Sequence, residues 1–160
     1  MAIWGKLLIM PLYNFAESFI DNVVRDQIDE PARGSIVYCD LAFGYAEHSG
    51  VYVGGGEIIH LNKDGIIESV DHKEFINGTS AMSIYAACCG TTPVGSEVVA
   101  RRATSMKGNY RSYNVILDNC HQFAAGCLSG DFDNSKNFLW MLKDESKNIL
   151  GSDSWRVWNP

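Results

Sequence analysis

Three features are scarce in this sequence: basic residues, long apolar runs and cysteines in paired patterns. The 160 residues include 13 lysines and arginines against 19 aspartates and glutamates, which gives a formal net charge of −6. Nucleic acids and anionic membranes bind through clustered basic side chains, and Arg101 and Arg102 form the only adjacent basic pair in the sequence. We therefore expect no nucleic-acid partner.

Apolar runs are too short for a membrane span. The N-terminal run contains Lys6, and no segment reaches the roughly 18 apolar residues that a transmembrane helix requires. No small-residue cleavage site of a signal peptide follows this run. We expect a cytoplasmic protein, with secretion without a classical signal as the alternative. Residues 3–12 are expected to complete the core, and a peripheral membrane contact is the second interpretation of this stretch.

The cysteines follow no disulfide or zinc pattern. A chain of this length buries roughly 68–70% of its extended-chain surface and needs no covalent staples, and an odd number of thiols fits a reducing compartment. Zinc sites use closely spaced ligand pairs, which the adjacent Cys88 and Cys89 do not provide. We therefore expect no metal and no cofactor. The five cysteines are Cys39, Cys88, Cys89, Cys120 and Cys127.

What is present is a series of short β-type runs between two amphipathic helices. With 46% apolar residues, residues 1–160 are predicted to form a single domain. Apolar periodicity predicts helices over residues 12–28 and 138–149. The β-branched runs and their glycine turns predict an antiparallel meander, so the fold class is α+β, with the sheet packed against helices. The expected strands are residues 35–39, 48–53, 57–61, 66–70, 98–102 and 113–117, with a short helix at 71–76 and either a helix or a buried strand at 79–89.

Two histidines occupy the ends of a predicted hairpin. His48 begins one strand, His60 ends the next, and the glycines at 54–56 predict the turn between them. No Lys-Ser/Thr follows these glycines, so they do not form a phosphate-binding loop. If the turn lies midway, the histidines face each other, and cross-strand side chains lie about 4.5–5.5 Å apart at Cβ. Two imidazoles can touch there, provided that the turn length puts both on one face.

Cys120 stands at the start of a predicted helix. Asp118 or Asn119 is the expected N-cap, and Gly130 is the expected end. The N–H groups at a helix start lower a thiol pKa and can receive the oxyanion of a tetrahedral intermediate. With an imidazole as base, Cys120 would be a thiol nucleophile. The alternative for Cys120 is a small buried apolar side chain.

These motifs and their order resemble the lecithin:retinol acyltransferase-like (LRAT-like) family. The resemblance covers about residues 31–130 and leaves the two flanking helices outside. It implies a permuted papain-like fold, in which the histidine strands precede the nucleophile helix. Two positions depart from the family pattern: Ser49 replaces the usual aromatic residue, and His121 with Gln122 replaces the usual Glu-His pair. The matching motifs are residues 48–54, 58–61, 113–114 and 119–123, within a frame of residues 31–37 and 65–68.

The resemblance implies a cysteine-dependent acyltransferase or hydrolase that acts through a thioester on phospholipid or another acyl ester. Cys120 would be the nucleophile, His48 the general base and His60 its orienting partner. Two alternatives stay open: a cysteine peptidase or amidase acting on peptidoglycan or peptide bonds, and a catalytically silent binding module of the same fold. The expected supporting or substrate-binding residues are Asn119, Tyr52 and His121.

Overall fold

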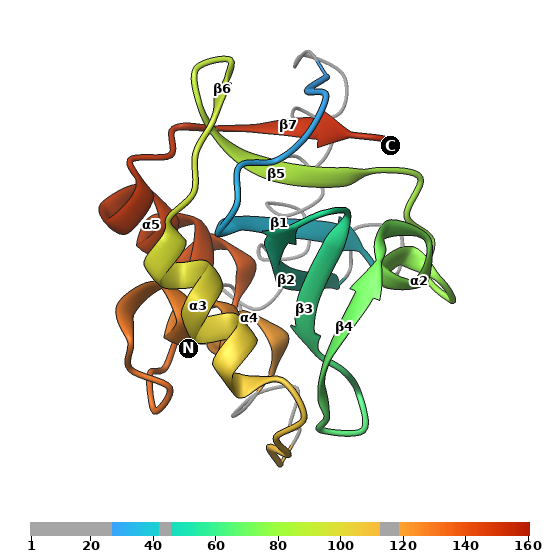
Figure 1. Cartoon of the computed structure of the whole chain (residues 1–160), viewed down its shortest axis with the longest axis vertical. Coiled ribbons are helices and arrows are strands. Elements are labelled where there is room, and N and C mark those ends of the chain that lie inside the picture. Colours follow the sequence, from blue (N-terminus) through green and yellow to red (C-terminus); the bar gives the residue numbers. More distant parts are fainter. Residues whose placement is uncertain (1–26, 42–45, 113–118) are drawn as a thin grey trace, which may run out of the picture.

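The computed structural model describes residues 27–41, 46–112 and 119–160, and these residues form an α+β architecture (Figure 1). An antiparallel sheet carries helices on its faces, as the sequence predicts. The strands are β1 (Ser35–Asp40), β2 (Glu47–Gly54), β3 (Glu57–Leu61), β4 (Ile67–Asp71), β5 (Ile84–Cys89), β6 (Thr92–Pro93) and β7 (Ser154–Trp158). The helices are α2 (His72–Ile76), α3 (Glu97–Met106), α4 (Cys120–Ser129) and α5 (Leu139–Leu150).

The first four strands form the predicted meander. Within the described ranges the strand order is β4-β3-β2-β1-β5-β6, and β7 pairs with β5. The turn between β2 and β3 lies at the predicted glycines, of which Gly55 and Gly56 have φ values of 65° and 82°. Residues with side chains rarely adopt such positive φ values. The glycines therefore fix where the hairpin reverses, and with it the register of the two histidine strands.

Alternation along the strands creates two apolar layers. On one face Val51, Ile59 and Tyr38 pack with residues of α3, α4 and α5, including Phe123 and Leu142. On the other face the opposite set of strand residues packs against α2. That second layer consists of Val37, Cys39, Tyr52, Ile58, Val70, Phe75, Ile84, Ala86 and Trp158. The sheet is therefore covered on both sides, and α4 lies on the side opposite Phe75.

The structure corrects several sequence expectations. Residues 98–102 belong to helix α3 rather than to a strand, and α3 buries Val99, Ala100 and Ala103, a helical spacing. The ambiguous stretch 79–89 contains strand β5, while β6 and β7 were not predicted. Ile28 bridges to Trp158 and is not helical, so the predicted helix over 12–28 is wrong at this end. The rest of that helix, the stretch 3–12 and the strand at 113–117 lie outside the described residues.

The predicted C-terminal helix is confirmed as α5. Leu139 and Leu142 are buried in the core and Leu150 packs partly against it. Gly151 follows with a φ of 70°, the left-handed conformation that commonly ends a helix. Within the described part of the chain, every helix is too short or too polar to cross a bilayer.

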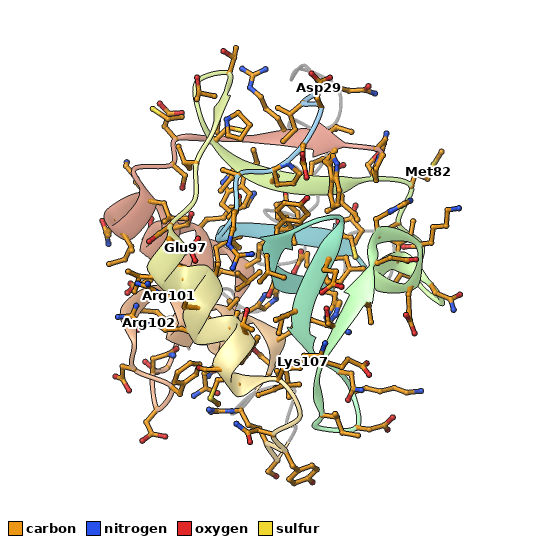
Figure 2. All side chains as sticks on the ribbon, viewed as in Figure 1. Asp29, Met82, Glu97, Arg101, Arg102 and Lys107 are labelled. Atoms are coloured by element: carbon orange, nitrogen blue, oxygen red, sulfur yellow. The ribbon has the colours of Figure 1, made fainter. Side chains whose placement is uncertain are left out.

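The adjacent basic pair lies on α3, with both side chains drawn on the outer part of that helix (Figure 2). Arg101 is exposed. Arg102 is half-buried and its Nη1 donates to the carbonyls of Cys127 and Leu128, at 3.2 and 2.7 Å. These carbonyls belong to the last turn of α4, where a cation interacts favourably with the helix end. Arg102 therefore holds α3 against α4.

Candidate active site

His48 and His60 lie on the same face of the β2–β3 hairpin. Val51 pairs with Ile59 in the ladder, so one step further along each strand His60 falls opposite Gly50. His48 is two residues from Gly50 and shares its face. The histidines are therefore diagonal neighbours. A turn midway between them would have placed them directly opposite each other. Diagonal positions are still within reach of long or aromatic side chains.

The two imidazoles touch inside the apolar layer formed with α2. Nε2 of His48 lies 2.5 Å from Nδ1 of His60, and the rings meet edge to face with centroids 4.8 Å apart. Phe75 covers both rings, at 4.9 Å from His48 and 5.6 Å from His60. Burial lowers the pKa of His48 to about 3, with His60 and His121 adding electrostatic repulsion. Both rings are therefore neutral near pH 7, and one of the two facing nitrogens carries the proton.

Glu68 extends this contact to a third residue. It pairs directly with His60 across β3 and β4, and its Oε1 lies 3.4 Å from His60 Nε2. This approach is within ion-pair distance but lacks hydrogen-bond geometry. Burial lowers the pKa of His60, and Glu68 opposes that shift. Asn62 Nδ2 donates to the same carboxylate oxygen at 2.8 Å, which orients it.

Glu68 is a site residue that the sequence reasoning missed. The signal was the turn at 62–65: Asn62 N–H donates to the Ile66 carbonyl, and Leu61 pairs with Ile67. A tight turn at this point puts His60 and Glu68 directly opposite each other. The Asn-Lys-Asp-Gly turn therefore predicts that His60 and Glu68 pair, once the turn is known to join Leu61 directly to Ile67.

Asn119 is the N-cap of α4, as predicted, and Cys120 is the first helical residue. The Oδ1 of Asn119 accepts hydrogen bonds from the N–H groups of His121 and Gln122, at 3.0 and 3.1 Å. The sequence predicts that the N–H groups at this helix start can receive an oxyanion. For His121 and Gln122 this prediction is wrong, because the Asn119 side chain already accepts from both N–H groups. Gly130 ends the helix with a φ of 86°, again as predicted.

The Cys120 sulfur lies against strand β2. Its Sγ is 4.0 Å from the carbonyl oxygen of Glu47. Burial raises the pKa of Cys120, and hydrogen bonds from Ser49 and from nearby backbone N–H groups lower it. Burial also raises the pKa of Cys39, and the Cys120 thiol adds to that shift. In the described ranges, the hydrogen-bonding neighbours of this sulfur from other elements are thus the two residues that flank His48, not an imidazole.

The structure therefore brings the predicted site residues together in two groups on either side of β2. His48 and His60 lie on the α2 side, and Cys120 lies on the α4 side, beside Glu47 and Ser49. The contact between the Cys120 sulfur and the His48 ring stays a prediction. Apo enzymes often hold such catalytic contacts long or poorly aligned until substrate binds.

His121 and Tyr52, both expected to support the site, have different surroundings. His121 Nδ1 lies 2.9 Å from Ser49 Oγ, so the histidine joins α4 to β2. Tyr52 packs against Trp158, and its hydroxyl bonds with Glu30 and accepts from the N–H of Gly56 at 3.1 Å. Tyr52 is thus engaged at the turn end of the hairpin, away from the His48 end of β2.

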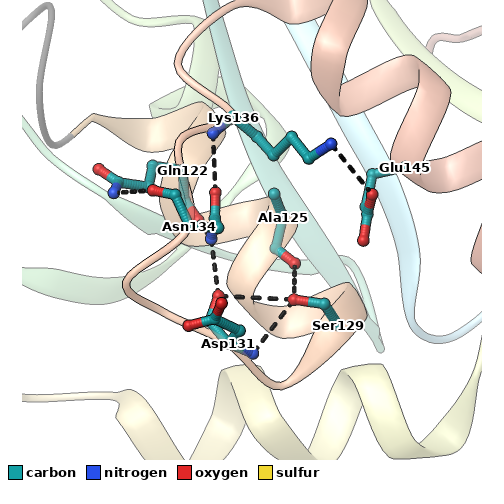
Figure 3. Close-up of polar contacts among 7 residues, drawn as sticks. All are labelled: Gln122, Ala125, Ser129, Asp131, Asn134, Lys136 and Glu145. Atoms are coloured by element: carbon teal, nitrogen blue, oxygen red, sulfur yellow. Dashed lines mark hydrogen bonds and ion pairs between the residues drawn. The ribbon is translucent and has the colours of Figure 1, made fainter.

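The segment after α4 folds back on the helix (Figure 3). Asn134 Nδ2 donates to the Gln122 carbonyl at 3.0 Å, and Gln122 Nε2 donates to the Asn134 carbonyl. Lys136 N–H donates to Asn134 Oδ1, and its ammonium group lies 3.6 Å from Glu145 on α5. Asn134 thus links the first turn of α4 to a segment that is itself tied to α5. This fixes the helix start that carries Cys120.

Comparisons with known proteins place part of this chain beside a known family. The family model described as "Lecithin retinol acyltransferase" matches residues 65–133. The match includes Glu68 and Cys120, and it begins after both His48 and His60. Over residues 65–133 the chain is therefore similar to the LRAT family.

Curated relatives are viral. Over 108 residues the chain is 28% identical to the genome polyprotein of avian encephalomyelitis virus, strain Van Reokel, and 27% identical to that of strain L2Z. Each alignment covers 67% of this chain and 5% of the polyprotein. The chain therefore matches a small part of these relatives.

Proposed function

We propose that the protein is a thiol acyl-transfer enzyme with a permuted papain-like arrangement, in which Cys120 is the nucleophile. The proposal is supported by the match of residues 65–133 to the family model described as "Lecithin retinol acyltransferase" and by the position of Cys120 at a helix start. The single observation that carries it is the buried 2.5 Å contact between His48 and His60. His48 lies on β2, the strand that the Cys120 sulfur contacts. A structural histidine needs no second imidazole, whereas a catalytic base needs an orienting partner.

The geometry gives each imidazole nitrogen a role. Glu68 faces Nε2 of His60, which favours the tautomer with the proton on that nitrogen. Nδ1 of His60 is then an acceptor, and it accepts from Nε2–H of His48. This leaves Nδ1 of His48 unprotonated, so this nitrogen is the one that takes the thiol proton. The series from Glu68 to His48 thus prepares a neutral base, which matches the lowered pKa of His48.

In the proposed reaction His48 Nδ1 takes the Cys120 proton, and the thiolate attacks the carbonyl carbon of an acyl ester. The tetrahedral intermediate collapses to a thioester, and the protonated His48 gives its proton to the departing alkoxide. Water, an amine or an alcohol then loses a proton to His48 and attacks the thioester, which releases the acyl product and restores the thiol. Phospholipid or another acyl ester is the proposed donor, by resemblance to the LRAT-like family. The cycle requires no metal or redox group.

A substrate panel tests this proposal. Purified protein is incubated with phospholipids and short acyl esters in one series, and with peptides and muropeptides in a second, and product release is measured. We expect turnover of esters by the wild type and by Cys89→Ala, which removes an exposed thiol, and none by Cys120→Ala. Turnover of the peptide series alone would replace the proposal by a peptidase. Turnover of neither series would leave a binding module of the same fold.

The cysteines bear on where the protein acts. We propose a cytoplasmic protein whose residues 1–160 act as one domain and which meets its lipid substrate at a membrane surface. The five free cysteines, of which only Cys89 is exposed, support a reducing compartment. A contact of residues 3–12 with membrane remains a prediction.

A further inference from the structure

Ser49 and His121 form a buried polar pair directly beside the Cys120 sulfur. Ser49 Oγ and His121 Nδ1 are 2.9 Å apart, and the two residues are 0% and 6% exposed. The pair lies on the α4 side of β2, opposite to the side on which His48 meets Phe75. The roles proposed for His48, His60 and Glu68 leave this pair unused.

Ser49 lies on the same face of β2 as Glu47, whose carbonyl oxygen is 4.0 Å from the Cys120 sulfur, and His121 directly follows Cys120 on α4. The serine hydroxyl and its backbone are among the groups that lower the pKa of Cys120. A thiolate in a buried site needs hydrogen-bond donors, because burial without them strongly disfavours the charged form. Ser49 supplies the one side-chain hydroxyl among those groups. The direction of its O–H therefore matters for the charge state of Cys120.

His121 determines that direction. A neutral imidazole carries one N–H, and when it is on Nδ1 it donates to Ser49 Oγ. The serine hydrogen is then free to point at the sulfur. Burial lowers the pKa of His121 to about 4, so the ring stays neutral near pH 7 and places no positive charge beside His48.

We infer that Ser49 and His121 are positioning residues that stabilise the Cys120 thiolate, through a series of hydrogen bonds from His121 Nδ1–H to Ser49 Oγ and from the Ser49 hydroxyl to the sulfur. The inference rests on the proposed function in that it assigns Cys120 as the reactive thiol. Ser49 and His121 occupy the positions where this sequence departs from the LRAT-like pattern. The pair therefore acts beside His48 and His60 and does not replace them.

Other titratable groups of the neighbouring strands stay constant in the test. They are Cys39, which interacts electrostatically with Cys120, and Asp40 on β1, Glu47 on β2, whose carbonyl oxygen contacts the sulfur, and His48 and His60 on the α2 side of the hairpin. A change in the titration of Cys120 on altering Ser49 or His121 alone therefore reports on this pair.

The pH dependence of alkylation tests the inference. Full-length protein is treated with iodoacetamide between pH 5 and 10, and mass spectrometry of the Cys120 peptide separates this thiol from the other four. We expect Ser49→Ala and His121→Leu each to reduce Cys120 alkylation at pH 7 about tenfold, by an upward shift of the midpoint of about one pH unit. His121→Asn, whose amide can donate near the position of Nδ1, should stay within about twofold of wild type.

The double variant distinguishes a series of hydrogen bonds from two separate effects. Ser49→Ala combined with His121→Leu should lose no more than the larger single loss, because both changes break the same series. Losses that multiply, or a Ser49→Ala profile that superimposes on wild type, would overturn the inference. Thermal unfolding checks that each variant is folded. If His121→Leu does not fold, the midpoint of Ser49→Ala alone decides.

This experiment does not depend on acyl transfer. A wild type that forms no acyl adduct, together with shifted alkylation profiles in the variants, would refute the proposed function and keep the positioning pair. An acyl adduct on Cys120 together with an unshifted Ser49→Ala profile would refute the pair alone.

Discussion

His48 and His60 touch through Nε2 and Nδ1 at 2.5 Å although they are not directly opposite in the β2–β3 ladder. The residue opposite His60 is Gly50, where an added Cβ would lie 2.7 Å from Ile58 Cγ2 and 3.2 Å from Phe75. The absence of a side chain there leaves room for Ile58 and for the Phe75 ring, which covers both histidines. A glycine at position 50 thus lets Phe75 pack closely over the diagonal contact.

Replacing Glu68 tests whether the carboxylate orients His60. Glu68→Gln removes the negative charge facing Nε2 and can present an amide N–H instead, which favours the tautomer with the proton on Nδ1 of His60. Nδ1 then cannot accept from His48. We expect kcat/KM for acyl transfer to fall about tenfold or more, in line with tautomer reversal in other triads. The measurement is the pH profile of kcat/KM.

The matched control for this change is Glu57→Gln. Glu57 also lies on β3, but its carboxylate accepts from Ser69 Oγ at 2.8 Å and faces no histidine. Its activity should remain within about twofold of wild type. Equal losses in the two variants would show that the charge of the sheet edge matters, rather than the contact with His60.

Asn119 is predicted to contribute to stability as well as to the site. Asn119→Ala leaves the N–H groups of His121 and Gln122 without their cap and removes the donor to the Asn137 carbonyl at 2.8 Å. We expect the free energy of unfolding to fall by about 1–2 kcal/mol, measured by urea denaturation. Asn119→Ser keeps a capping oxygen, without the donor to Asn137, and should recover about half of that loss. A Ser variant as unstable as the Ala variant would contradict the role of the cap.

The buried histidines predict a loss of stability on mild acidification. His48 and His121 titrate at about 3 and 4 in the folded chain, against 6.5 when unperturbed. Between these values the unfolded chain binds more protons, so the free energy of unfolding falls as the pH falls. Each histidine should contribute about 2 kcal/mol between pH 7 and pH 5. The carboxylates with lowered pKa, Asp71 and Asp153, titrate below their ordinary 3.8 and act only at lower pH.

Urea denaturation of wild type and His121→Asn at several pH values measures this effect. The variant should lose about a third to a half of the decrease that the wild type shows between pH 7 and pH 5, because His48 and His60, whose pKa values burial also lowers, remain. An identical decrease in both proteins would mean that His121 is protonated in the folded state.

Much of the fold was predictable because it rests on local signals. The glycines at 54–56 located the hairpin, and Asn119 with Gly130 located both ends of α4. Residues 98–102 were mistaken for a strand because two adjacent valines favour β-structure, whereas packing on the sheet through Ala100 and Ala103 selects a helix. Strand β7 was not predicted, since its pairing with β5 joins segments far apart in the sequence.

The site was predictable in its residue types and less so in its contacts. The chemistry of Cys120, His48 and His60 is visible in the sequence, and the family match covers the cysteine. The contact of Glu68 with His60 depends on strand register. That of Ser49 with His121 depends on which face of β2 meets α4, and neither is a property of a local motif.

The most direct test of the central claim is trapping of an acyl-enzyme. Wild-type protein is mixed with phospholipid or a short acyl ester, quenched in acid within the first turnover, and analysed by intact mass and peptide mapping. The account predicts a hydroxylamine-sensitive acyl group on Cys120, retained in Cys89→Ala, strongly reduced in His48→Asn and absent in Cys120→Ala. An adduct that persists in Cys120→Ala, or no adduct with any ester, would contradict it.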